Sequence, residues 1–249
     1  MAVRSEEVVE TAVSEKKLRF EVPLYTLAEA ARALDVPSTT FATWARGDER
    51  PGPGRTAMNG AAIVTTVAGD PGRPAIPFVG LAEGMVLAAV RRAGVPMQRV
   101  RPALAVLARE LGVEHALASQ RLYTDGAELL FDFSTTLDDR AAVAARELVV
   151  VRSGQRVFHD VIDQYLKRIE YAGDGYPRLI HLPAYDRADV VVDPGRSFGQ
   201  PIFAHGGARI EDVLSRFWAG EDIAALSEEF GVPEPEIEDV LRAASRKAA

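Results

Sequence analysis

Short hydroxyl side chains and arginines gather between residues 38 and 73, in a pattern that could bind nucleic acid. Serine and threonine hydroxyls can bond to phosphates or reach base edges, and arginine guanidinium groups can pair with phosphate oxygens on either flank. The candidates for these DNA contacts are Ser38, Thr39, Thr40, Thr43, Arg46, Arg50, Arg55 and Arg73.

Side chains for catalysis or metal binding are few, and their spacing is unsuitable. The four histidines show neither an i, i+4 pair nor an H-E-x-x-H motif; they are His115, His159, His181 and His205. The chain has no cysteine, which excludes disulfides, thiolate metal sites and cysteine nucleophiles. Adjacent residues point to different sides of a helix or strand, so His159, Asp160 and Asp163 do not form a convincing acid–base cluster. A nucleophile elbow, a P-loop and a dinucleotide fingerprint are all absent. We expect no enzyme, no metal and no cofactor.

The hydroxyl cluster needs a helix to present it, and the pattern from Tyr25 onward predicts two. Apolar residues at 27, 30, 31 and 34 form one stripe of a first helix. Thr26 and Glu29 have the spacing of a capping box, which fixes where this helix begins. The run from Asp35 to Ser38 then breaks it.

A second helix is predicted from a cap at Ser38 or Thr39 to Gly47. Phe41 and Trp44 lie on its buried side, which turns the hydroxyl residues and Arg46 outward. Two short amphipathic helices joined by a tight turn form a helix-turn-helix, whose second helix enters the DNA major groove. The alternative is a helical hairpin that only packs within the protein.

Two extended runs follow the helices and predict the hairpin wing of a winged helix-turn-helix. They are Ala61–Ala68 and Ala75–Val79, joined by a turn at residues 69–72. Helices are then expected over Leu81–Ala93 and Met97–Leu111. These two helices and the central sheet are the expected dimer surfaces.

The remaining patterns predict an α+β fold with a central small mixed sheet and a C-terminal three-helix module that resembles a helix-turn-helix. Extended runs lie at 127–133, 147–161 and 176–184, with a helix over Asp160–Ile169. A short strand and a glycine-rich loop follow residue 188, before helices at Ile210–Ala219, Ile223–Phe230 and Pro233–Arg246. The expected division is 1–22, a loose arm or short strand; 23–112, the winged helix-turn-helix and the helices after it; 113–187, a central α+β region; and 188–249, the C-terminal helical domain.

Charge and hydropathy favour a cytoplasmic protein. The net charge is −7, but five arginines and one acid lie in 84–110, while ten acids and two arginines lie in 206–241. A protein that touches DNA at one end and a basic partner at the other would show this polarity; two ordinary solvated surfaces would show it too. The sequence has neither a secretory signal nor an apolar run of the ~18 residues that cross a membrane.

The N-terminal residues resemble the start of MerR-like and excisionase-like winged helix domains. The matching positions are Tyr25-Thr26-Leu27-Ala28-Glu29-Ala30-Ala31, Leu34-Asp35-Val36-Pro37, Thr40-Phe41 and Trp44. The chain departs from effector-sensing MerR regulators because no long dimerisation helix with a cysteine-bearing metal loop follows.

The C-terminal residues are similar to a small antitoxin domain with a "GxRI" motif, formerly uncharacterised. The match includes Asp193-Pro194-Gly195, Phe198-Gly199-Gln200-Pro201-Ile202-Phe203, Gly207-Ala208-Arg209-Ile210, Trp218-Ala219-Gly220-Glu221 and Phe230-Gly231-Val232. Ala208 stands where the motif usually has threonine. Together the two resemblances imply a large VapB-type antitoxin.

This resemblance implies the antitoxin of a type II pair, which neutralises a VapC-like PIN-domain ribonuclease and represses its own operator as a homodimer. Such antitoxins often insert a basic side chain into the toxin's acidic metal cleft, so Arg242, Arg246 and Lys247 become candidates. The alternative is that these three side chains only favour the negative end of the last helix. Arg209 is expected to bond loop carbonyls or a partner carboxylate. The alternatives are a stand-alone regulator whose central region binds a small effector, and a scaffold protein.

Overall fold

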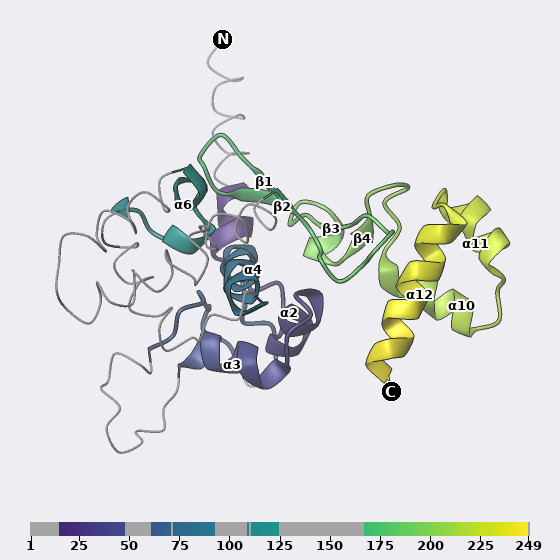
Figure 1. Ribbon diagram of the computed structural model, residues 1–249, viewed down its shortest axis with the longest axis horizontal. Helices are drawn as coiled ribbons and strands as arrows, with labels where there is room; N and C mark the ends of the chain where they lie inside the picture. The colour runs from purple at the N-terminus through teal and green to yellow at the C-terminus, as the bar shows by residue number, and fades with distance from the viewer. Residues whose placement is uncertain are drawn as a thin grey trace, which may run out of the picture.

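The structure is a computed structural model that describes residues 15–47, 61–70, 72–92, 109, 111–124 and 167–248. These residues form helices and one small antiparallel sheet, which confirms the predicted α+β class. Figure 1 shows the sheet between the helices of the N-terminal half and α10–α12. Arg50 and Arg55, the runs at 127–133 and 147–161, and nearly all of the helix expected from Met97 lie outside the described residues. None of the described helices is long and apolar enough to cross a membrane.

Helices α2 (Leu27–Ala33) and α3 (Ser38–Arg46) form the predicted helix pair. The capping box is present: the Glu29 N–H donates to Thr26 Oγ1 at 3.2 Å, and the Thr26 N–H donates to Glu29 Oε2 at 2.7 Å. The expected cap at Ser38 or Thr39 was wrong. Pro37 precedes the helix, its carbonyl accepts from the N–H groups of Thr40 and Phe41, and Ser38 is already the first helical residue.

Helix α4 (Phe78–Arg92) runs through the core, and every residue from Phe78 to Val90 is buried. It begins three residues earlier than expected, so Phe78 and Val79 form its first turn instead of the end of a strand. The expectation that this helix offers a dimer surface was also wrong, because the chain itself covers it. Gly84 lets α3 approach closely: a Cβ there would lie 2.6 Å from Phe41 Cε2 and 2.9 Å from Leu34 Cδ1.

The predicted wing is not a regular hairpin in the residues that the structure describes. Its two halves meet through one backbone bond, from Val67 N–H to the Ala75 carbonyl at 2.8 Å. Ile76 pairs instead with Tyr25, in an isolated antiparallel bridge. The N–H groups of Ile63 and Val64 donate to the Trp44 carbonyl at 2.8 and 3.2 Å. Backbone groups of the β-rich run therefore bond to the helix pair instead of forming a regular strand pair.

Residues 15–20 are helical, which corrects the expectation of a loose arm or strand for this part of 1–22. Arg19 is 8% exposed and binds Asp174 with both terminal nitrogens, at 3.1 and 2.6 Å. The Phe20 ring lies 5.3 Å from His115 and 5.0 Å, edge-on, from Tyr176. One ion pair and one aromatic cluster thus hold a segment that has no apolar stripe of its own.

The sheet contains β1 (Ile169–Tyr171), β2 (Pro177–His181), β3 (Val190–Val192) and β4 (Ile202–Phe203), in that order. All its pairings are antiparallel, so the expectation of a mixed sheet was wrong for these strands. Ile180 pairs with both Ile169 and Val192, which places buried side chains in register. Ile169 opens β1, so the helix expected over Asp160–Ile169 cannot reach its predicted end. The sheet also continues across the boundary expected between residues 187 and 188.

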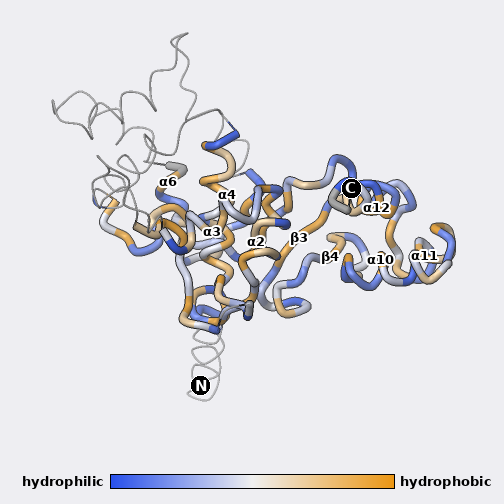
Figure 2. Tube along the Cα trace, turned by 90° about the horizontal axis from the view of Figure 1, so that it is seen from below, coloured by the Kyte–Doolittle hydropathy of each residue, from blue (hydrophilic) through white to orange (hydrophobic). Residues whose placement is uncertain are grey.

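The C-terminal helices are α10 (Ile210–Trp218), α11 (Ile223–Phe230) and α12 (Glu234–Ala248), close to their predicted bounds. Figure 2 shows the contrast between hydrophobic β3 and the hydrophilic residues along α12. Arg216 joins α10 to α11 by binding the carboxylates of Glu221 and Glu229. Short elements complete the fold: η2 (Ala116–Ala118), α6 (Gln120–Thr124) and η3 (Ser197–Gly199).

Candidate nucleic-acid interface and C-terminal module

Helix α3 presents its polar residues outward, as predicted. Ser38, Thr39, Thr43 and Arg46 are exposed and Thr40 is half-buried, whereas Phe41 and Trp44 are 0% and 1% exposed. The Thr43 hydroxyl donates to the Thr39 carbonyl at 2.9 Å, one turn earlier in the same helix. The structure thus brings five of the eight predicted DNA contacts together on one helix.

The buried side of α3 fixes the direction in which this polar face points. The rings of Phe41 and Trp44 pack edge-to-face, with centroids 6.1 Å apart. Arg92, at the end of α4, donates to the carbonyls of Leu34 and Asp35 at 2.9 and 3.2 Å. These two bonds connect the end of α4 to the turn between α2 and α3. A rigid helix pair of this kind is what groove recognition needs, because a helix that rocks cannot keep several base contacts in register.

Arg73 is exposed, and its nearest described acid is Asp70 at 3.9 Å, with side chains 79% and 85% exposed. A pair this open to water contributes little to stability, so the guanidinium of Arg73 can exchange Asp70 for a phosphate. Arg50 and Arg55, the other two flanking candidates, fall in the part of the chain that is not described.

Sequence reasoning missed a buried polar cluster beneath the expected wing. Glu83 is 4% exposed on α4 and accepts from the N–H of Thr65 at 2.5 Å and from its hydroxyl at 3.0 Å. His115 Nδ1 lies 2.9 Å from Thr65 Oγ1 and 3.3 Å from Glu83 Oε1. The available signal was a single glutamate in the otherwise apolar run from Phe78 to Val90, because a buried carboxylate requires partners.

The predicted partner-binding cations differ in how they are held. Arg209 NH2 donates to Glu211 Oε2 at 2.7 Å, and NH1 lies 3.9 Å from Asp212 Oδ1. Arg209 therefore pairs with carboxylates in the first turn of its own helix. We had expected it to bond loop carbonyls or a partner carboxylate; among the described residues its side chain bonds no loop carbonyl, and the partner carboxylate stays a prediction. Arg242 lies 3.9 Å from Glu238 and 3.7 Å from Asp239. Arg246 is exposed, and the Lys247 side chain lies outside the described part of the chain.

Part of the acidic character of α12 serves the fold and cannot meet a partner. Asp239 is 0% exposed, and one of its oxygens accepts from the N–H groups of Asp186, Arg187 and Ala188 at 2.8, 2.8 and 3.1 Å. Burial acts to raise the pKa of Asp239, but the three N–H bonds and Arg242 outweigh it and leave the pKa below its usual value.

Two exposed aromatic side chains were also missed. Phe198 is 86% exposed and Trp218 is 64% exposed. Phe198 has φ +53°, a left-handed conformation that bulky residues rarely adopt. Pattern analysis assumes that large apolar residues face inward, so it could not select these two. Exposed aromatics are enriched among the residues that anchor protein interfaces.

Comparisons with known proteins bear on both halves of the chain. Residues 23–104 match a family model described as "Putative DNA-binding HTH domain". The chain is 47% identical over 232 residues to "Putative antitoxin VapB45" of Mycobacterium tuberculosis, which covers 92% of this chain and 97% of that protein. It is 26% identical over 226 residues to "Uncharacterized protein Rv2308" of the same organism, with 88% of each chain covered.

A solved structure supports the same relationship. The crystal structure of Rv2018 from M. tuberculosis superposes with a TM-score of 0.75 at 44% identity, and covers 90% of this chain and 100% of that one. Identity at this level over nearly the whole length carries both the fold and the family. With its outward polar helix and its helix-turn-helix match, the chain belongs to the family of the large antitoxin VapB45, a VapB-type protein with an N-terminal helix-turn-helix domain.

Proposed function

We propose that this protein is the antitoxin of a type II toxin–antitoxin pair, which binds its own operator as a repressor and neutralises a VapC-like PIN-domain ribonuclease. The observation that carries the DNA-binding half is α3, whose polar side faces solvent while Phe41 and Trp44 anchor it from within. The name of the 47% identical relative supports the antitoxin half. Both partners of such a pair work in the cytoplasm, and we place the protein there.

The operator contact is assigned to α3 and its flanks. Ser38, Thr39, Thr40 and Thr43 meet base edges and phosphates, while Arg46, Arg50, Arg55 and Arg73 pair with phosphates. One such module covers only a few base pairs, so we propose that a homodimer reads a two-fold symmetric operator.

The toxin contact is assigned to the C-terminal module. Arg246 and Lys247 lie at the free end of α12, where a cation could enter an acidic metal cleft; Arg242 stands one turn earlier, close to Glu238 and Asp239. Phe198 supplies an aromatic anchor, since a side chain held 86% exposed at positive φ gains most from burial against a partner. Arg209 is not assigned to the toxin contact; it precedes α10 and binds Glu211 in the first turn of that helix.

Co-expression tests the antitoxin assignment. We predict that the adjacent open reading frame encodes a PIN-domain protein that arrests growth when it is expressed alone, and that this chain relieves the arrest and co-purifies with that protein. A triple variant with Arg242, Arg246 and Lys247 changed to alanine should relieve it less. The matched control is Arg178→Ala, which removes an exposed arginine from β2. Failure of the unaltered chain to relieve the arrest or to co-purify would overturn the antitoxin assignment. Full activity of the triple variant would remove these three cations from the toxin contact.

A further inference from the structure

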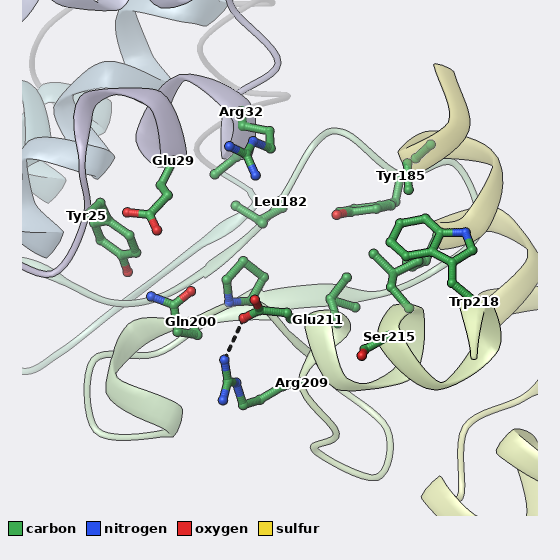
Figure 3. A pocket seen from close by; sticks show the side chains of 17 residues that line it. Tyr25, Glu29, Arg32, Leu182, Tyr185, Gln200, Arg209, Glu211, Ser215 and Trp218 are labelled. Carbon is green, nitrogen blue, oxygen red and sulfur yellow. Dashed lines mark hydrogen bonds and ion pairs between the residues drawn. The ribbon is translucent and has the colours of Figure 1, made fainter. Parts of the chain in front are cut away.

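A cleft lies between the DNA-binding helices and the C-terminal module, and the proposed function does not use it. Its volume is about 720 Å³, within the range of roughly 300–1,000 Å³ that is typical of small-molecule sites. Figure 3 shows α2 on one side and α10 and α12 on the other, with the sheet residues between them. An occupant would therefore contact both parts of the protein.

One wall of the cleft is apolar. Leu182, Ile210 and Val240 form buried parts of the lining, and Leu214 is half-buried. Trp218 stands at the rim with 64% of its surface exposed. An apolar group that entered the cleft would bury this indole, which is the main unburied apolar surface there.

The polar lining of the cleft combines the carboxylates of Glu29 and Glu211 with donors on Arg32, Arg209 and Tyr185. Among the described residues Arg209 makes one hydrogen bond, to Glu211, although a guanidinium carries five N–H donors. Its Nε is buried without a hydrogen-bond partner. The Tyr185 hydroxyl also has no hydrogen-bond partner among the described residues, and Figure 3 shows it pointing into the cleft. Burial raises the pKa of Tyr185, which keeps the phenol protonated and able to donate.

We propose that the cleft is a binding site for a small amphipathic carboxylic acid. The apolar body lies against Trp218, Leu214 and Val240, and the carboxylate accepts from Arg209. A carboxylate complements a guanidinium with spare donors, because it can accept two parallel N–H bonds. The lining contains none of the residues assigned to the toxin contact. Leu182 and Tyr185 belong to the central region in which the sequence alternative placed an effector site, while the rest of the lining lies outside that region.

Fluorescence of 8-anilinonaphthalene-1-sulfonate, an aromatic anion, tests the site in the full-length protein. The dye should bind saturably with one site per chain, and decanoate should displace it. Decyltrimethylammonium, with the same chain length and opposite charge, should displace it at least tenfold less well. Absence of saturable dye binding, or equal competition by the cationic detergent, overturns the proposal.

Variants locate the binding within the cleft. Arg209→Ala should weaken decanoate binding by about tenfold, while Arg178→Ala, which removes an exposed arginine outside the lining, should leave it unchanged. Ser215→Phe and Ala244→Phe each fill the cleft from a different helix and should abolish displaceable dye binding. Circular dichroism checks that each variant folds. Ser215 is exposed, so Ser215→Phe still tests the site if Ala244→Phe does not fold. Unchanged decanoate affinity in a folded filled variant places the ligand elsewhere and refutes the site.

Discussion

The Tyr25 hydroxyl donates a hydrogen bond of 2.8 Å to the carbonyl of Gly199, across 174 residues of sequence. Tyr25 stands directly before the helix pair and is 2% exposed. Gly199 ends the turn that carries Phe198, and has φ +72°. One buried bond thus joins the DNA-binding module to the loop before β4. Burial, together with the charges of Asp193 and Glu29, raises the pKa of Tyr25 well above its usual value, so the hydroxyl remains a donor.

Replacement of Tyr25 by phenylalanine should destabilise the protein by about 1–3 kcal/mol, because the buried Gly199 carbonyl loses its donor. Equilibrium urea unfolding of the two proteins measures the difference. A loss below a few tenths of a kcal/mol would contradict the view that this bond is a principal tie between the two modules.

Replacement of Gly199 by alanine should lower the stability of the protein more than replacement of Gly231 by alanine. Both glycines have positive φ, +72° and +64°, but a Cβ at Gly199 would lie 2.7 Å from the Tyr25 hydroxyl, while nothing lies within 4 Å of a Cβ at Gly231. The backbone strain is common to both alanine variants and amounts to about 1 kcal/mol. The additional loss of thermal stability in Gly199→Ala reports the close approach of Tyr25. Equal losses would show that the loop can move away.

Gly84→Ala should disturb the packing of α3 against α4. The added methyl group would meet Phe41 and Leu34 at 2.6 and 2.9 Å, and overpacking of this kind costs about 1–3 kcal/mol. Gly173→Ala is the control, since that position is open and has no positive φ. We expect a lower melting temperature together with weaker operator binding in the Gly84 variant only. A variant with normal stability and DNA affinity would show that α3 does not depend on this contact.

Asp239 should make stability depend on pH on the acidic side. Its pKa is lowered in the folded protein, so its stabilising effect is complete above the unfolded value of 3.8 and disappears as the pH falls through the lower, folded value. Asp239→Asn should therefore destabilise the protein by about 2 kcal/mol at pH 7 and by much less in strong acid. Glu238→Gln, half-exposed on the same helix, serves as the control. The same loss at both pH values would assign the effect of Asp239 to packing instead of charge.

Phe198→Ser should weaken toxin binding by at least tenfold without lowering stability, because the side chain is 86% exposed in the free protein. Co-purification and calorimetry with the proposed PIN-domain toxin measure the first quantity, and thermal unfolding measures the second. Among the described residues, the exposed large apolar side chains are Phe198 and Trp218. Trp218→Ser is therefore the companion variant. If toxin affinity stays unchanged in Phe198→Ser, another surface forms the contact.

Local signals predicted most of the helical parts of the fold. The capping box of Thr26 and Glu29 involves residues that are close together in sequence. The same is true of the apolar stripes of α2, α3 and α10–α12. These helices fall within a few residues of their predicted bounds. The β-rich run at 61–68 misled because it has high strand propensity, while its backbone groups bond to Trp44 and Ala75 instead of to one regular partner strand. Strand propensity does not identify the partner.

Features that depend on distant residues were out of reach of the sequence. The outward face of α3 could be predicted because Phe41 and Trp44 share one helix stripe. The Arg19–Asp174 pair, the Glu83 cluster and the cleft at Arg209 each join segments that no periodicity connects. The burial of Asp239, which binds backbone N–H groups at residues 186–188, could not be predicted for the same reason.

The affinity of the protein for a duplex containing its own promoter tests the central claim most directly. Fluorescence anisotropy across a salt series should compare the unaltered chain with Thr39→Asp and Thr43→Asp, which place negative charge on the exposed side of α3. Ser245→Asp puts the same charge on an exposed position of α12. We predict that each α3 variant binds at least tenfold more weakly, and that Arg46→Ala reduces the salt slope by about one. Equal promoter affinity in all four aspartate and alanine variants would contradict the assignment of α3 to the DNA.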